Sequence, residues 1–159
     1  MTLAIPVNLF FRKKKAQAVY FAIAVSVIVF LMYFFKLYYA EPRPFWASDG
    51  IKAFDCSAEY GNPSGHTMNG FGFTLILLLD FFETNTITST KRAIYIVLMV
   101  LFGSSVGFSR AILGSHSLDQ ILFGFMIGVW IALTFHYVFR ERLMSHLNNM
   151  VSRIDQQYY

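Results

Sequence analysis

Residues 109–120, SRAILGSHSLDQ, place an arginine, a histidine and an aspartate in one short turn of the chain. Apolar runs flank this turn, 93–108 before it and 121–139 after it, and a membrane helix needs about 17–25 such residues. Charged groups beside the hydrocarbon are costly, so they pair with one another, line a wet cavity or take part in chemistry. The turn therefore predicts two membrane helices that are joined at a functional site.

Two further apolar windows, 16–35 and 67–82, bring the number of predicted helices to four. Charged residues make up only 14% of the chain, against about 25% in soluble domains. The first and last windows have full spanning length, and the middle two reach it when neighbouring motif residues extend the helices. The sequence predicts an all-α, integral membrane bundle with four transmembrane helices.

The predicted organisation follows from these windows. Residues 1–15 form a cytosolic-side segment, and residues 16–139 form a single four-helix membrane domain that includes a long loop at 36–63. Residues 140–159 form a cytosolic-side tail. The first window is interpreted as an uncleaved anchor helix, because it is too long for the apolar core of a signal peptide.

The positions of the basic residues predict the orientation of this domain. A four-helix path puts the clusters at 12–15 and 91–92 and the arginines of the tail on one side of the membrane. Positive charges favour the cytosolic side or its equivalent in an organelle, so both termini are expected there and the loops at 36–63 and 109–120 on the opposite side. The net charge of +4 is thus explained without a nucleic-acid partner, for which a basic stripe with exposed aromatics would be needed.

Several polar and small residues are interpreted as structural. Asp80 and Glu83 would form a solvated helix end, and the single cysteine, Cys56, cannot form an intrachain disulfide. His136 and His146 lie far from the 109–120 turn. The glycine pairs at 103 and 107 and at 124 and 128 have the four-residue spacing that lets membrane helices approach closely.

Two other stretches carry chemistry that matches the turn. Lys36 and Arg43 lie in the loop before Pro44, and Pro63-Ser64-Gly65-His66 begins the second helix. Together with Arg110 they give three cations on one face, where arginine provides paired donors for a phosphate. Each cation also has a plainer interpretation, since Lys36 could snorkel to the interface and Arg43 could brace the loop.

The start of the second helix adds a further anion-binding feature. Ser64 and Gly65 precede the first free N–H groups of the helix, which point at an anion, although Ser64 could equally be an ordinary N-cap. His66 and His116 are the histidines on this side. One could attack phosphorus as a neutral imidazole while the other protonates the leaving oxygen, whereas a lone histidine would more often be structural.

The three stretches resemble the signature motifs of the type 2 phosphatidic acid phosphatase superfamily, which also contains glucose-6-phosphatase and the vanadium haloperoxidases. The motifs are Lys-(six residues)-Arg-Pro at 36–44, Pro-Ser-Gly-His at 63–66 and Ser-Arg-(five residues)-His at 109–116. The resemblance implies that His116 forms a phosphohistidine and that His66 protonates the leaving group. It also implies a phosphate site made of Lys36, Arg43, Ser64, Gly65 and Arg110. No metal or other cofactor is implied.

The chain departs from the family pattern at the end of the third motif. The family usually has an aspartate four residues after the nucleophile to orient it, but here Gln120 has that place and Asp119 comes one residue early. Glucose-6-phosphatases also carry glutamine there. Both residues are candidates for orienting His116, and activity is expected to be reduced or specialised if Asp119 cannot swing in. Alternatively, Ser117 and Gln120 form a capping box, and Asp119 suits the helix dipole.

The second departure is length, because family members usually have six or more membrane helices and this chain has the last four. A partner protein would cover the flank that the missing pair leaves open. The leading hypothesis is a membrane phosphatase that acts among membrane lipids on a lipid phosphate, a lipid diphosphate or another small phosphate ester, through a phosphohistidine. The alternatives are a weak or inactive phosphatase fold that serves as a structural subunit of a larger complex and, last, a haloperoxidase.

Overall fold

The computed structural model describes residues 14–52, 54 and 57–158. Most of the predicted N-terminal segment, up to residue 13, and Cys56 lie outside the described residues. No strand occurs in the described ranges, so the prediction of an all-α protein is confirmed. The elements are α2 (Lys15–Tyr39), α3 (Pro44–Ala47), α4 (Gly65–Thr84), α5 (Ser89–Ile112), α6 (Leu118–Thr134), the π-helix η1 (Phe135–Phe139) and α7 (Arg140–Tyr158).

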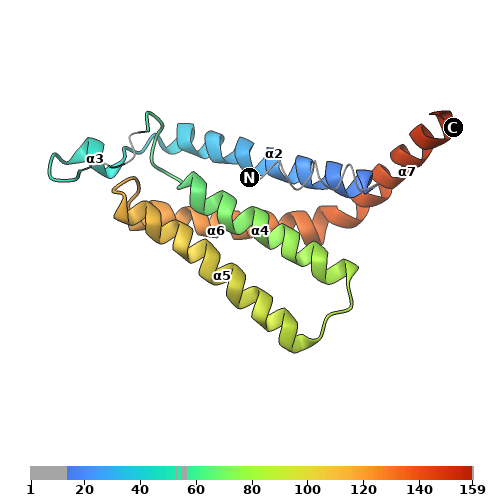
Figure 1. Cartoon of the computed structure of the whole chain (residues 1–159). Coiled ribbons are helices and arrows are strands. Elements are labelled where there is room, and N and C mark those ends of the chain that lie inside the picture. Colours follow the sequence, from blue (N-terminus) through green and yellow to red (C-terminus); the bar gives the residue numbers. More distant parts are fainter. Residues whose placement is uncertain (1–13, 53, 55–56, 159) are drawn as a thin grey trace.

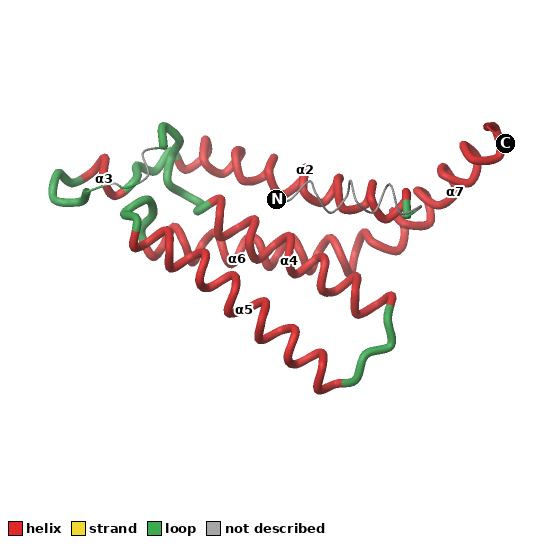
Figure 2. Tube along the Cα trace, in the orientation of Figure 1, coloured by secondary structure: helices red, strands yellow, loops and turns green. Residues whose placement is uncertain are grey.

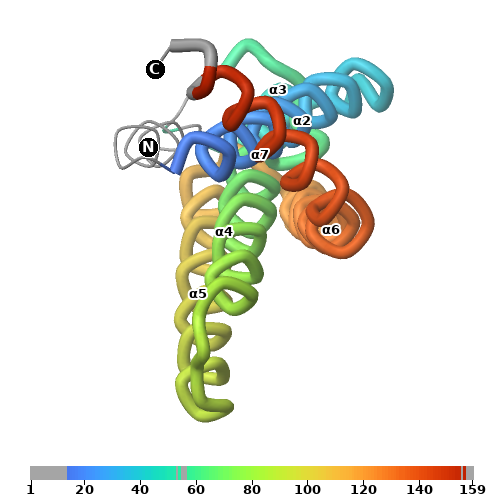
Figure 3. The backbone as a smooth tube through the Cα atoms, turned by 90° about the vertical axis from the view of Figure 1, so that its right-hand side faces the viewer, coloured from blue at the N-terminus to red at the C-terminus, as the bar shows by residue number. Residues whose placement is uncertain are grey.

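The long helices form a bundle around α4. This helix contacts α2, α5 and α6, and Figure 3 shows α5 and α6 on opposite sides of it. The loop that carries α3 and the turn between α5 and α6 lie together at one end of the bundle (Figures 1 and 2). The α4–α5 loop and α7 lie toward the other end. The topology therefore brings the three sequence motifs to a single end.

Three helical stretches, 15–47, 89–112 and 118–154, are long and apolar enough to cross a membrane. The 20 residues of α4 extend about 30 Å, which is the thickness of the hydrocarbon core, and α4 packs among the other three. Its polar residues, among them Thr67, Asn69 and Asp80, lower its hydropathy. The protein is an integral membrane protein with the predicted four-helix bundle.

Local signals at the end of α2 place two of the predicted cations. Ala40 ends the helix in the left-handed conformation (φ 45°), and its N–H donates to the carbonyl of Lys36 at 3.1 Å. This is a common way to terminate a helix. Pro44 then opens α3 with Arg43 as its N-cap, where a proline is favoured because its missing N–H has no partner to lose. Lys36 and Arg43 thus lie on either side of one tight turn.

The predicted glycine contacts are confirmed between α4 and α6. A Cβ atom at Gly124 would lie 2.6 Å from the carbonyl oxygen of Ser64, and one at Gly128 would lie 2.5 Å from that of Met68. On α5, a Cβ at Gly103 would lie 2.5 Å from the ring of Phe71. The two backbones of α4 and α6 therefore meet at a distance that only glycine allows.

We expect Gly128→Ala to destabilise the bundle by about 1–3 kcal/mol, because the added methyl overpacks against backbone that cannot move independently. The matched control is Gly70→Ala on α4, where the nearest atom to a new Cβ lies 3.8 Å away. That change should be neutral or slightly stabilising, because alanine favours helix. Thermal unfolding in detergent measures both variants. Equal midpoints would mean that α4 and α6 are not packed this closely.

The prediction of a solvated helix end is wrong for Asp80 and holds for Glu83, which is exposed. Asp80 is only 2% exposed, and its carboxylate accepts hydrogen bonds from Arg140 Nε and NH2 at 2.9 and 2.8 Å and from the Gln17 amide. The reason is tertiary, because the path through α6 and η1 brings Arg140 to the end of α4. The ion pair joins α4 to α7, and the hydrogen bond from Gln17 adds α2, at the end of the bundle remote from the motifs.

Candidate active site

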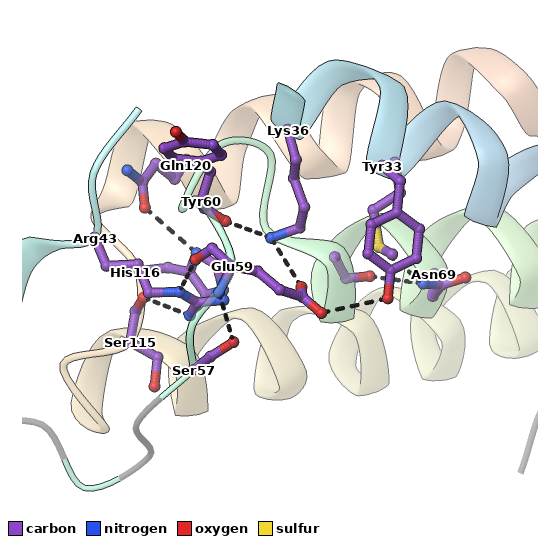
Figure 4. A network of polar contacts seen from close by, with 12 residues as sticks. Tyr33, Lys36, Arg43, Ser57, Glu59, Tyr60, Asn69, Ser115, His116 and Gln120 are labelled. Carbon is purple, nitrogen blue, oxygen red and sulfur yellow. Dashed lines mark hydrogen bonds and ion pairs between the residues drawn. The ribbon is translucent and has the colours of Figure 1, made fainter. Parts of the chain in front are cut away.

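A cavity of about 850 Å³ lies at the motif end, between α2, α4, α5 and the loop before α4. Figure 4 shows polar side chains that converge there from α2, α4, the loop before α4 and the turn between α5 and α6. The structure brings together residues from all three motifs around it. The candidates that line it are Lys36, Arg43, Gly65, His66, Arg110 and His116.

Two of the cations are buried and hold the loop before α4. Lys36 Nζ donates to the carbonyl of Tyr60 at 2.5 Å, and Arg43 Nε donates to the carbonyl of Glu59 at 2.7 Å. Arg43 therefore braces a loop and also lines the cavity, so its two interpretations are compatible. A buried cation needs hydrogen-bond partners, and here backbone carbonyls provide them.

Arg43 also contacts the turn that carries the third motif. Its NH1 donates to the carbonyl of Ser115 at 3.1 Å and lies 3.3 Å from Nε2 of His116. The side chain is 4% exposed, so the N–H donors of its planar guanidinium are held in one fixed orientation. Arg43 thereby links the loop before α4, the α5–α6 turn and the imidazole of His116.

Hydrogen bonds to Gln120 determine which nitrogen of His116 carries the proton. The Gln120 amide nitrogen donates to the carbonyl of Pro42 at 3.0 Å, and Oε1 accepts from the N–H of Ser117 at 3.3 Å. These partners orient the amide, because a carbonyl only accepts and an N–H only donates. Oε1 also lies 3.3 Å from Nδ1 of His116, so Nδ1 is the protonated nitrogen. Nε2 is left with its lone pair beside Arg43.

The environment of His116 keeps the imidazole neutral. Burial, followed by the positive charges of Arg43 and Lys36, lowers the pKa of His116 from 6.5 to about 4. The hydrogen bonds to Gln120 and to the Gly61 backbone act in the opposite direction and are outweighed. At neutral pH, Nε2 of His116 is therefore available as a nucleophile.

The structure distinguishes the two residues that could orient this imidazole. Gln120 is buried against His116 and supplies the glutamine half of the predicted capping box, whereas Asp119 is exposed on the first turn of α6. Asp119 does not belong to the described lining of the cavity. Successive helical residues are rotated by about 100°, so the one-residue displacement directs Asp119 away from His116.

We expect Gln120→Glu to raise the pKa of His116 from about 4 toward 6.5, because a carboxylate stabilises the imidazolium. A raised pKa protonates the nucleophile at higher pH, so the acid limb of kcat/KM should move to higher pH. Asp119→Asn, the control, should leave the limb in place. Profiles of both variants measure this, and a shift in Asp119→Asn alone would mean that Asp119 reaches the imidazole.

The residues of the second motif occupy different positions around the cavity. Gly65 and His66, at the start of α4, line it, and His66 is exposed to its interior. The hydroxyl of Ser64 lies 3.0 Å from that of Thr67, and the serine is fully buried outside the described lining. The N–H groups of the first turn of a helix have no intrahelical partner, so at this motif the backbone at 65–66, and not the Ser64 hydroxyl, is the candidate for binding an anion.

Sequence reasoning missed two residues of the loop before α4. A Cβ at Gly61 would lie 2.6 Å from the amide of Gln120, so this glycine makes room for the residue that orients His116. Glu59 lines the cavity and forms an ion pair with Lys36 at 3.5 Å. In the sequence, Gly61 is recognisable only as a loop residue, because nothing there indicates its contact with Gln120. Glu59 is one of four acidic residues in the segment 36–63, so the sequence does not single it out.

Comparisons with known proteins agree with the motif resemblance. The sequence model of the PAP2 superfamily matches residues 16–144. Dolichyldiphosphatase from Saccharomyces cerevisiae is 30% identical over 89 residues, which are 55% of this chain and 37% of that protein. The chain thus spans about a third of the length of this curated relative.

A similar fold is known from a crystal structure. It is that of a transmembrane PAP2-type phosphatidylglycerolphosphate phosphatase from Bacillus subtilis, which matches 84% of this chain and 64% of its own length with a TM-score of 0.72. The sequences are 19% identical, so this match shows a common fold. Both comparisons leave part of the larger relative without a counterpart in this chain.

Proposed function

This chain belongs to the PAP2 superfamily, and we therefore propose that it is a membrane phosphatase that hydrolyses a lipid phosphate or lipid diphosphate through a phosphohistidine. One observation carries the proposal. A neutral histidine, protonated on Nδ1 through Gln120, presents Nε2 at 3.3 Å from Arg43 in a cavity with two more cations and a second histidine. A scaffold has no need of this arrangement.

The proposed reaction uses each group in the position that it occupies. Lys36, Arg43, Arg110 and the N-terminus of α4 bind the phosphate oxygens, which is most of what phosphoryl transfer requires of a protein. The lone pair of Nε2 on His116 attacks phosphorus, and the bond to the leaving oxygen breaks as a protonated His66 donates its proton to that oxygen. Water then attacks the phosphohistidine while His66 takes up a proton from that water. Inorganic phosphate departs, and His116 is again a neutral imidazole.

The cavity favours a lipid as the carrier of the phosphate. Its lining continues from the cations to Val29 and Met32 on α2, which lie on a helix long and apolar enough to span the bilayer. A head group at the cations would therefore have its chain directed along α2 into the membrane. The yeast relative is a dolichyldiphosphatase, which supports a lipid diphosphate as the first substrate to try.

The described basic residues support the orientation in which the site faces away from the cytosol. Lys14, Lys91, Arg92 and Arg142 belong to the ends of helices that lie away from the motif loops. Positive charge is retained on the cytosolic side. The termini would then be cytosolic, or on the equivalent side of an organelle, and phosphate would be released on the other side.

The test is phosphate release by the detergent-purified full chain from a polyisoprenyl diphosphate, a phosphatidylglycerol phosphate and phosphatidic acid. Release that vanadate inhibits and that His116→Ala abolishes is expected, because vanadate adopts the five-coordinate geometry of phosphorus in the transition state. Folded protein that releases no phosphate from any of them would overturn the proposal and favour the structural-subunit alternative.

A further inference from the structure

We propose that the carboxylate of Glu59 is an internal anion that occupies part of the phosphate site in the free protein and swings out when a phosphate binds. This inference relies on the proposed function only for the identity of the incoming group. Glu59 is the acidic residue among the described residues that line the cavity, and it lies among its cations. Figure 4 shows its side chain between Lys36 and Tyr33.

The contacts of the carboxylate show that it competes for a cation. One oxygen lies 3.5 Å from Nζ of Lys36, and the other accepts from the hydroxyl of Tyr33 at 3.3 Å. Lys36 is otherwise buried and also donates to a backbone carbonyl. The ammonium of Lys36 has three donors, of which the Tyr60 carbonyl and the Glu59 carboxylate take two, so a phosphate that approaches from the cavity competes with this carboxylate. Glu59 therefore opposes the occupation of the site by any weaker anion.

The surrounding structure lets the side chain move while the loop stays in place. The carbonyls of Glu59 and Tyr60 accept hydrogen bonds from Arg43 and Lys36 at 2.7 and 2.5 Å, so two buried cations hold the backbone. The Glu59 side chain itself is 46% exposed, and exposed side chains change rotamer in picoseconds to nanoseconds. Displacement then requires only rotation of one side chain toward water.

This arrangement excludes anions that bind the cations weakly, and the charge of a ligand determines how strongly it binds them. A phosphate monoester carries a charge of about −1.5 to −2 at neutral pH, and a diphosphate carries more, so either can displace a single carboxylate. A phosphodiester carries one negative charge and gains little by the exchange. The bulk lipids of a bilayer are phosphodiesters, so Glu59 would keep them from occupying the site. Its return would also expel inorganic phosphate after the reaction.

The experiment measures anion binding to the full chain by calorimetry, with two probes. Inorganic phosphate is used at mildly alkaline pH, where it is a dianion, and dimethyl phosphate serves as the monoanionic diester. We expect Glu59→Gln to bind phosphate about two- to fivefold more tightly, in line with the loss of a partly exposed ion pair. The gain for dimethyl phosphate should be a similar factor, because the same carboxylate leaves its contacts with Lys36 and Tyr33 in both cases, so the diester should occupy the site of the variant at a lower concentration.

Two further variants separate competition from a loss of charge or of structure. Asp49→Asn removes an exposed acid of the preceding loop and should leave both affinities unchanged. Tyr33→Phe removes the hydrogen bond from the Tyr33 hydroxyl to the Glu59 carboxylate. It should change phosphate affinity in the same direction as Glu59→Gln but by a smaller factor. The midpoint of thermal unfolding shows whether each variant is folded.

The outcomes for this inference and for the proposed function are distinct. If Glu59 only positions Lys36, Glu59→Gln will bind phosphate less tightly or equally well, and the internal-anion proposal is overturned even if the protein hydrolyses lipid phosphates. If phosphate binds more tightly to Glu59→Gln while no lipid phosphate is hydrolysed, the internal anion stands and the proposed enzyme does not. In an active enzyme, Glu59→Gln should lower KM and make phosphate a stronger product inhibitor.

Discussion

Replacing His116 by alanine is expected to lower kcat by about 10⁴-fold or more, as removal of a covalent nucleophile does in other enzymes. The neutral imidazole is the group whose lone pair lies beside Arg43 in the cavity. Nothing at position 116 of the variant can form the covalent intermediate. The direct measurement is rapid quenching with substrate labelled on phosphorus, in which the wild-type chain should retain a label that survives alkali and is lost in acid, as a phosphohistidine does.

The matched comparison is His66→Ala, which removes the second histidine of the same cavity. As the proposed proton donor, His66 matters most for a poor leaving group. Its variant should recover much of its rate on p-nitrophenyl phosphate, whose leaving oxygen needs no proton, while His116→Ala should remain inactive on that substrate. A label still retained by His116→Ala would contradict the proposal, because the nucleophile would then be another residue.

The fold was predictable because apolar windows are local properties of the sequence. The four windows correspond to α2, α4, α5 and the path through α6 and η1, and the helix ends extend past the windows by a few motif residues. The ion pair between Asp80 and Arg140 was not predictable in this way. The partners lie 60 residues apart, and only the packing of the helices brings them together.

The candidate site also has parts that the sequence predicts and parts that depend on tertiary packing. The motif spacing predicted that Lys36, Arg43, His66, Arg110 and His116 come together, and the structure places them around one cavity. Whether Asp119 or Gln120 faces His116 depended on where α6 begins, since one residue changes the direction of a side chain by about 100°. The place of Glu59 depended on a loop whose path is determined by hydrogen bonds to Arg43 and Lys36. Loop paths of this kind leave no periodic signal in a sequence.

Arg43→Lys is expected to lower kcat/KM by about 10²–10³-fold, the usual effect of removing one preorganised donor to a developing charge. Arginine uses two nitrogens of one rigid group, Nε for the Glu59 carbonyl and NH1 for both the Ser115 carbonyl and Nε2 of His116. Lysine keeps the charge but has a single nitrogen on a flexible stem, so it cannot reproduce this fork.

The effect of Arg43→Lys on kcat shows whether Arg43 acts through the geometry of its guanidinium or only through its positive charge. If charge alone bound the substrate, the variant would keep kcat within about threefold and show at most a raised KM, as loss of uniform binding does. If the fork holds His116 in line with phosphorus, kcat itself must fall, and added guanidinium should restore part of it in Arg43→Ala. Arg142→Lys, an exposed arginine on α7, is the matched control and should change neither constant. A normal kcat in Arg43→Lys would therefore assign the alignment of His116 to Gln120 alone.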